Sequence, residues 1–175
     1  MLRRQIGTSL YAGLLCTVLG LTAWASGQPF IFPSLGPSAF ILAFKTRGEQ
    51  TNTYRIVGSH LIGGIVGLVT YTVIAGDISL ITPLPALSVD GLRLTASAVS
   101  SVILTSWGMI ATDLIHAPAC ATTLIVSLGL LSSPLQVVTI VVSVSILVAF
   151  HAAAHMIYTH VSTNPCTDPS SVASD

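Results

Sequence analysis

The sequence predicts an all-α polytopic membrane protein, and three observations lead to that prediction. Only 7% of the 175 residues are charged, against about 25% in an ordinary soluble domain. Hydrophobic residues make up 52% of the chain. Charged residues are also absent from long stretches, such as those between Arg55 and Asp77 and between Arg93 and Asp113, and about 20 apolar residues cross a bilayer as a helix. This composition argues against a soluble enzyme, and the zero net charge argues against a nucleic-acid partner.

Six apolar segments follow one another along the chain. The four that match the length of a membrane span are residues 9–26, 56–76, 94–112 and 135–158. Two are shorter, residues 30–44 and 118–131, and a helix of about 14 residues reaches only about 21 Å. Prolines lie at the start of both short segments, and proline favours the first turn of a helix while disfavouring helix in the residue before it. We therefore expect two half-helices after extended entries, the first entry being residues 28–35.

The N-terminal segment has two interpretations. Arg3, Arg4 and the run Ala23-Trp24-Ala25 resemble a secretory signal with its cleavage site. The apolar run is long for a signal, however, and it has a counterpart later in the chain. We favour an uncleaved membrane span.

The basic residues predict the topology. With the N-terminal arginines in the cytoplasm, a crossing by residues 30–44 also places Lys45, Arg47 and Arg55 there, as the positive-inside rule requires. We expect six crossings, both termini in the cytoplasm and a location in the plasma (inner) membrane. Residues 1–160 are then a single transmembrane domain, and the polar residues 161–175 a disordered tail.

The order long, short, long occurs twice and suggests an internal repeat, residues 8–76 and 93–158. Residues 36–39, Gly-Pro-Ser-Ala, match residues 117–120, Ala-Pro-Ala-Cys. Three crossings per half make the halves inverted in the membrane, an architecture of many secondary transporters. The alternative is a chance match of two apolar patterns.

The starts of the two half-helices are the candidate binding site. The first turn of a helix has unpaired N–H groups and the positive end of the helix dipole, which suit an anion. In the inverted arrangement the two starts face each other near the midplane. The candidate substrate-binding residues are Ser34, Gly36, Pro37, Ser38, Ala39, His116, Pro118, Ala119, Thr122 and Thr123. The alternative is helix packing through small residues, which we favour for Gly63, Gly64 and Gly67.

Ionisable residues at membrane depth are candidates for proton coupling. They are His60, His116 and Asp113, with a structural hydrogen bond as the alternative for the histidines. Asp113 has three interpretations: a cap for the second entry, a partner of His116, or a solvated loop residue. His151 and His155 have a spacing that suits a metal ion, but no third ligand lies near them in the sequence, and we expect neither a metal nor another cofactor.

Three motifs resemble the HPP family of integral membrane proteins. Residues 112–124, Thr-Asp-Leu-Ile-His-Ala-Pro-Ala-Cys-Ala-Thr-Thr-Leu, resemble the family's His-Pro-Pro-Ala-Gly-Ala-Thr-type signature. Residues 33–39 resemble its earlier Gly/Ser/Ala-rich segment, and residues 58–64 resemble its Gly-x-His-Leu stretch. Ala117 replaces the first proline of the signature and Cys120 its glycine, so that the signature reads His-Ala-Pro.

The resemblance implies a small membrane protein, and family members in plastids and cyanobacteria are associated with nitrite transport. We therefore expect a secondary transporter or facilitator of a small anion, nitrite first, in contact with the lipid bilayer. A non-transporting scaffold or assembly subunit is the alternative. The sequence has no G-x-S-x-G or H-E-x-x-H motif, and we expect no enzyme activity. Self-association into a homo-oligomer is compatible with so small a unit.

Overall fold

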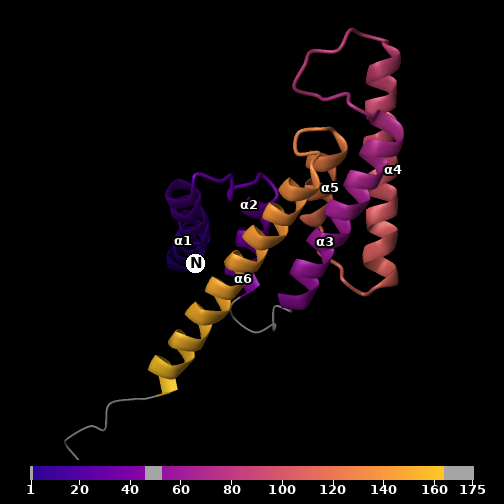
Figure 1. Cartoon of the computed structure of the whole chain (residues 1–175). Helices are drawn as coiled ribbons and strands as arrows, with labels where there is room; N and C mark the ends of the chain where they lie inside the picture. Colours follow the sequence, from indigo (N-terminus) through magenta and orange to yellow (C-terminus); the bar gives the residue numbers. More distant parts are fainter. Residues whose placement is uncertain (1, 46–52, 164–175) are drawn as a thin grey trace, which may run out of the picture.

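The computed structural model describes residues 2–45 and 53–163, and its regular elements there are all helical (Figure 1). In chain order they are α1 (Leu2–Ser26), α2 (Leu35–Lys45), α3 (Thr53–Thr70), the π-helical turn η1 (Tyr71–Ala75), α4 (Val89–Ala111), α5 (Ala119–Ser127) and α6 (Pro134–Thr163). Four stretches within these elements are long and apolar enough to cross a membrane: Gln5–Ser26, Thr53–Ala75, Val89–Ala111 and Pro134–His160. The all-α polytopic prediction is confirmed.

Local sequence signals explain where the helices begin and end. Ser88 caps α4, because its Oγ accepts a hydrogen bond from Gly91 N at 3.1 Å. A reciprocal capping box opens α6, where Ser133 Oγ accepts from Gln136 N at 3.3 Å and Gln136 Oε1 accepts from Ser133 N at 3.0 Å. Gly27 ends α1 with φ +66°, in the left-handed region that glycine adopts without steric cost.

The last helix is longer than the sequence analysis expected. It continues to Thr163, so residues 161–163, assigned to the disordered tail, are helical. Neither proline nor glycine occurs between Pro134 and Pro165, and a helix ends at or before the residue preceding a proline. The rest of the expected tail, residues 164–175, lies outside the described residues, as does Arg47.

Each short helix follows a non-helical stretch, as expected. Residues 27–34 precede α2 and residues 112–118 precede α5, and both stretches end in a two-residue turn. The two helix starts do not align with the motif match made from the sequence. Pro37 lies within α2, two residues after its start, whereas Pro118 immediately precedes α5. The order long, short, long recurs in the two halves of the described chain. The matched prolines, however, occupy different positions relative to the starts of α2 and α5.

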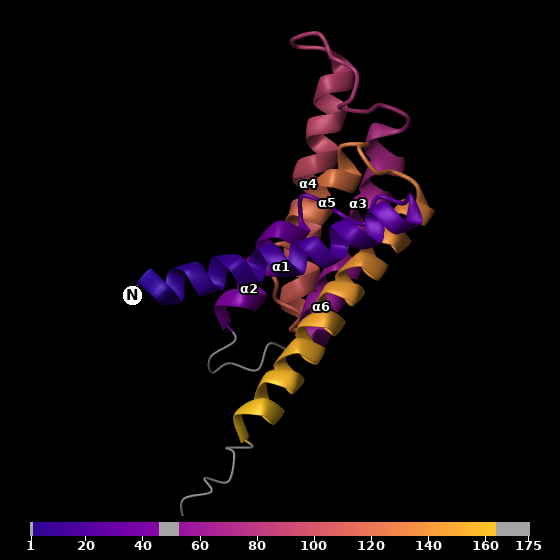
Figure 2. The same ribbon diagram turned by 90° about the vertical axis from the view of Figure 1, so that its left-hand side faces the viewer.

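Figures 1 and 2 show how the helices are arranged. The helices α3 and α4 are antiparallel neighbours, and α5 packs against both of them. On the other side of α6, α2 packs chiefly against α1 and only lightly against α6. The short helices α2 and α5 run in opposite directions. The loop between η1 and α4 lies at the opposite end of the molecule from the C-terminal end of α6.

Glycines allow α3 to approach its neighbours closely. A Cβ on Gly63 would lie 2.6 Å from Thr123 Oγ1, and one on Gly67 would lie 2.9 Å from the Thr123 carbonyl oxygen. A Cβ on Gly64 would lie 2.6 Å from Val137 Cγ1 of α6. These distances support the packing interpretation of the three glycines, and the approach brings α5 against the part of α3 that carries His60.

Candidate functional site

Four polar side chains from four parts of the chain form one hydrogen-bonded network. Thr122 Oγ1 of α5 lies 2.7 Å from His60 Nδ1 of α3. His60 Nε2 lies 3.2 Å from Ser38 Oγ of α2. Ser38 Oγ in turn lies 3.0 Å from Nε2 of His116, in the non-helical stretch before α5. We call Thr122, His60, Ser38 and His116 the histidine–hydroxyl network.

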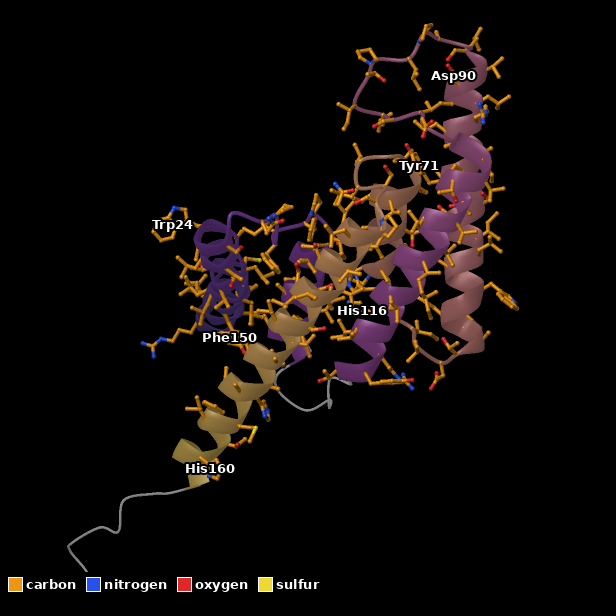
Figure 3. The ribbon with its side chains drawn as sticks, viewed as in Figure 1. Trp24, Tyr71, Asp90, His116, Phe150 and His160 are labelled. Atoms are coloured by element: carbon orange, nitrogen blue, oxygen red, sulfur yellow. The ribbon has the colours of Figure 1, made fainter. Side chains whose placement is uncertain are left out.

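The network is buried inside the helix bundle. Ser38, His60 and Thr122 have no exposed surface, and His116 is 7% exposed. Figure 3 places His116 near the middle of the molecule, between the distant ends marked by Asp90 and His160. An unpaired polar group in hydrocarbon costs free energy. Each of these side chains is hydrogen-bonded to at least one other member of the network. The sequence analysis had selected all four residues, and the structure brings them together.

The stretch before α5 fixes the backbone of His116. The first three amides of α5 donate to this stretch: Ala119 N to the His116 carbonyl at 3.0 Å, Cys120 N to that of Ala117 at 3.0 Å and Ala121 N to that of Pro118 at 3.1 Å. The expectation that these amides are free to hold an anion is therefore wrong for α5. In α2, Leu35 N donates to the Phe32 carbonyl at 2.9 Å, and Pro37 has no N–H. The hydrogen bonds that join the four members of the network are all between side chains.

The hydroxyl of Ser34 is buried beside the network and has no hydrogen-bond partner in the described part of the chain. Its side chain has no exposed surface, and among the described residues its Oγ is the buried side-chain polar atom that has no hydrogen-bond partner. Its carbonyl oxygen, by contrast, accepts from Ser38 Oγ at 3.3 Å. A buried hydroxyl without a partner costs about 1–3 kcal/mol relative to one that is paired. Ser34 therefore has an unused donor beside the network.

The other candidate substrate residues divide into packed and exposed positions. Thr123 Oγ1 is hydrogen-bonded to Thr105 Oγ1 of α4 at 2.9 Å and donates to the Ala119 carbonyl at 3.2 Å. Ala39, Pro118 and Ala119 are buried, whereas Gly36 and Pro37 are exposed. The exposed pair lies on the outer side of α2, away from the network.

Further hydroxyls join α4 to α5. Ser101 Oγ donates to Ser127 Oγ at 3.0 Å, and Ser97 Oγ donates to the Ser127 carbonyl at 3.0 Å. Together with the Thr105–Thr123 contact, they form a buried polar seam along this helix pair. The sequence analysis did not identify the seam, although the spacing of Ser97, Ser101 and Thr105 places them on one helical face.

Asp113 lies at the edge of the site and not within it. It forms an ion pair with Arg55 at the start of α3, and the two side chains are 74% and 44% exposed. Its backbone adopts φ +54° in the turn after α4. The sequence analysis weighed a cap, a pair with His116 and a solvated residue, and it missed Arg55 as a partner.

A second histidine contact lies between α1 and α6. Tyr11 Oη is hydrogen-bonded to His151 Nδ1 at 3.0 Å, and the ring of His155 lies 6.5 Å from that of His151. The sequence analysis missed Tyr11, although a tyrosine in an apolar segment needs a partner for its hydroxyl. The described part of the chain holds no group of three or more His, Cys, Asp or Glu side chains placed to bind a metal.

Comparison with known proteins identifies one family. A family model described as "HPP, transmembrane region" matches residues 2–165, which includes all the helices and the whole network. No curated protein and no solved structure matches the chain.

Proposed function

The chain belongs to the HPP transmembrane family, and from this premise we propose that it is a secondary transporter or facilitator of a small anion, with nitrite as the first candidate. The family makes it a membrane protein in contact with lipid. The anion would bind beside the histidine–hydroxyl network, near the start of α2 and the stretch before α5.

The unpaired hydroxyl of Ser34 is the observation on which the proposal depends. It is buried next to the network, whose four side chains are hydrogen-bonded to one another. A carboxylate-like or nitrite-like oxygen accepts a hydrogen bond from a hydroxyl and would give Ser34 the partner that it lacks. Ala39 and Ala119, both fully buried, are small residues of this part of the bundle.

The charges of the chain suggest that the anion is accompanied by a proton. Burying an isolated anion costs far more free energy than burying a neutral group, so a cation must compensate it. No lysine or arginine lies between Arg55 and Arg93 or between Arg93 and the C-terminus. His60 and His116 are the titratable side chains of the network, and protonation of either would supply the compensating charge. Transport would then be electroneutral.

Burial of the network suggests that the structure represents an occluded state. At the end that carries the loop between η1 and α4, Ser79 Oγ donates to the Gly129 carbonyl at 2.8 Å and Leu80 N donates to the Leu128 carbonyl at 3.1 Å. At the other end, Asp113 pairs with Arg55. We propose that the two halves form an inverted repeat and that opening of one end at a time gives alternating access.

We further propose that the protein lies in the plasma (inner) membrane with both termini in the cytoplasm. The basic residues Arg3, Arg4 and Arg55 support this orientation. The loop between η1 and α4 would then face outward.

Flux into proteoliposomes tests the function. We expect purified protein to accelerate nitrite uptake, an inward proton gradient to increase it, and a membrane potential set with potassium and valinomycin to leave it unchanged. Ser38→Leu should abolish uptake, whereas Ser145→Leu, at an exposed position of α6 whose Oγ donates to the Val141 carbonyl, should not. Folding of each variant is checked by size-exclusion chromatography.

Two results would count against the proposal. Absence of flux for nitrite and for other small anions, from folded protein, would support the scaffold alternative. Uptake that depends on the membrane potential and does not change with the proton gradient would show that the histidines do not compensate the charge of the anion.

A further inference from the structure

Ser38 touches both histidines of the network. Its Oγ lies 3.2 Å from His60 Nε2 and 3.0 Å from His116 Nε2. Each imidazole therefore faces the Ser38 hydroxyl with its Nε2 atom. The two ring centroids are 5.5 Å apart. The Ser38 hydroxyl also lies 3.3 Å from the Ser34 carbonyl oxygen.

The number of hydrogens limits how these contacts can be satisfied. A serine hydroxyl has one hydrogen to donate, and a carbonyl oxygen can only accept. When Ser38 donates to the Ser34 carbonyl, both histidines must donate through Nε2–H. When Ser38 donates to one histidine, the other histidine must donate to Ser38. At least one imidazole therefore carries its hydrogen on Nε2 in every arrangement.

We propose that Ser38 relays a proton between His116 and His60, so that the two histidines act as one proton-carrying unit. This inference rests on the proposed function, in which the unit compensates the charge of the anion. It assigns to Ser38 a role in proton movement beyond contact with substrate.

The transfer balances in atoms and charge. His116 begins as the cation, with hydrogens on both nitrogens, and His60 begins neutral with its hydrogen on Nδ1. The Nε2–H bond of His116 breaks as its proton forms a new O–H bond on Ser38, while the former hydroxyl proton of Ser38 leaves to form the Nε2–H bond of His60. His116 ends neutral, His60 ends as the cation, and Ser38 is unchanged. Thr122 Oγ1, 2.7 Å from His60 Nδ1, accepts from the resulting imidazolium.

Among the described residues, the arginines of α3 and α4 have partners of their own. Arg55 pairs with Asp113 at the start of α3, and Arg93 Nε of α4 donates to the Ile74 carbonyl at 3.0 Å. On α6, His151 is hydrogen-bonded to Tyr11. The half-buried thiol of Cys120 lies on α5. The hydroxyls that contact the imidazoles are neutral: Ser38 contacts both rings, and Thr122 contacts His60.

The relay has a consequence for α2. With both histidines donating, the Ser38 proton goes to the Ser34 carbonyl, at the turn that begins this helix. With one histidine accepting, that carbonyl loses its bond to Ser38. The protonation of the histidines is therefore linked to a hydrogen bond at the start of α2.

Nuclear magnetic resonance of the histidine side chains tests the relay without requiring any flux. The protein is labelled with ¹⁵N-histidine in lipid nanodiscs, and the Nδ1 and Nε2 shifts of His60 and His116 are followed against pH. We expect the two residues to titrate over the same pH range in the unaltered protein and in Ser38→Thr, which keeps the hydroxyl. In Ser38→Ala they should titrate separately.

Ser143→Ala is the matched control. Ser143 of α6 is also fully buried, and its Oγ donates to the Thr139 carbonyl at 2.7 Å, so its loss removes a buried hydroxyl without touching a histidine. This variant should titrate like the unaltered protein. Separate titration of His60 and His116 in the unaltered protein, or joint titration that persists in Ser38→Ala, would overturn the relay.

Nitrite flux then separates failure of the relay from failure of the proposed function. The measured quantity is the ratio of uptake with an inward proton gradient to uptake without it. In Ser38→Ala the increase that the gradient produces should be lost, whatever the uptake without the gradient, and Ser38→Thr should restore it. If the unaltered protein carries no anion, the proposed function fails while the resonance titration still decides the relay.

Discussion

His60 and Thr122 meet 2.7 Å apart between α3 and α5, through Nδ1 of the imidazole and Oγ1 of the hydroxyl. Both side chains are fully buried, and they come from the helix pair that the glycines of α3 bring together. A histidine that uses both ring nitrogens in this way is held in one orientation. The position of the network therefore depends on how closely α5 packs against α3.

We predict that Thr122→Val lowers the free energy of unfolding by about 1–3 kcal/mol, because it keeps the shape of the side chain and leaves His60 Nδ1 buried without its partner. Thermal unfolding in detergent, followed by intrinsic fluorescence, measures the change. Thr72→Val is the control, since Thr72 of η1 is exposed and donates to the Leu68 and Val69 carbonyls, one turn earlier at the end of α3. Equal shifts in the two variants would mean that the contact with His60 adds nothing.

Gly63→Ala should destabilise the protein by about 1–3 kcal/mol through overpacking. The new Cβ would lie 2.6 Å from Thr123 Oγ1 and 2.8 Å from the Ala119 carbonyl oxygen, and the carbonyl belongs to backbone that cannot rotate away. Gly13→Ala in α1, where a Cβ meets nothing within 4 Å, should be neutral or slightly stabilising because alanine favours helix. Melting temperatures compare the two variants, and a stabilised Gly63→Ala would contradict the packing described here.

Gly129→Ala and Gly27→Ala separate backbone strain from steric conflict. Both glycines have φ near +70°, at +71° and +66°, so either substitution costs about 1–2 kcal/mol of left-handed strain. At Gly129 the Cβ would also lie 2.7 Å from Tyr71 Cε2 and 2.8 Å from the Ile78 carbonyl oxygen, whereas at Gly27 nothing lies within 4 Å. Gly129→Ala should therefore melt at the lower temperature, and the reverse order would argue against the contact between η1 and the α5–α6 connection.

The ion pair of Arg55 and Asp113 should contribute little to stability. Both side chains are substantially exposed, and such pairs are worth about 0.2–1 kcal/mol and weaken with added salt. A double-mutant cycle with Arg55→Gln and Asp113→Asn, measured at low and high salt, gives the coupling energy. A large coupling that salt does not reduce would show that the pair is shielded from water.

The helices were largely predictable from their apolar composition and, for α3 and α4, from the charged residues at their ends. The two short helices were predictable from their prolines, and the members of the network from their polar character in apolar surroundings. The contacts among them were not predictable. Ser38 and His116 are 78 positions apart, and their meeting depends on the packing of helices from both halves.

Other features could not be derived for related reasons. Asp113 had three interpretations from the sequence, none of them a pair with Arg55, and only the fold brings Arg55 next to it. The bonded amides of α5 depend on how tightly the stretch before it turns, which proline alone does not specify. The link between Tyr11 and His151 joins the two ends of the chain, where no local pattern relates one residue to the other.

The brevity of α2 and α5 has a consequence for biosynthesis. They contain 11 and 9 residues, about half of the roughly 20 that a segment needs to cross the hydrocarbon unaided. We therefore expect neither helix to insert into lipid by itself during translocation. The ribosome makes α3 and α4 before α5, so both surfaces against which α5 packs exist when it emerges. When α2 emerges, only α1 is present, and His60 and α6 have still to be synthesised. The packing of α2 against α1 can therefore form at once, whereas the contact of Ser38 with His116 has to wait until the second half of the chain is made.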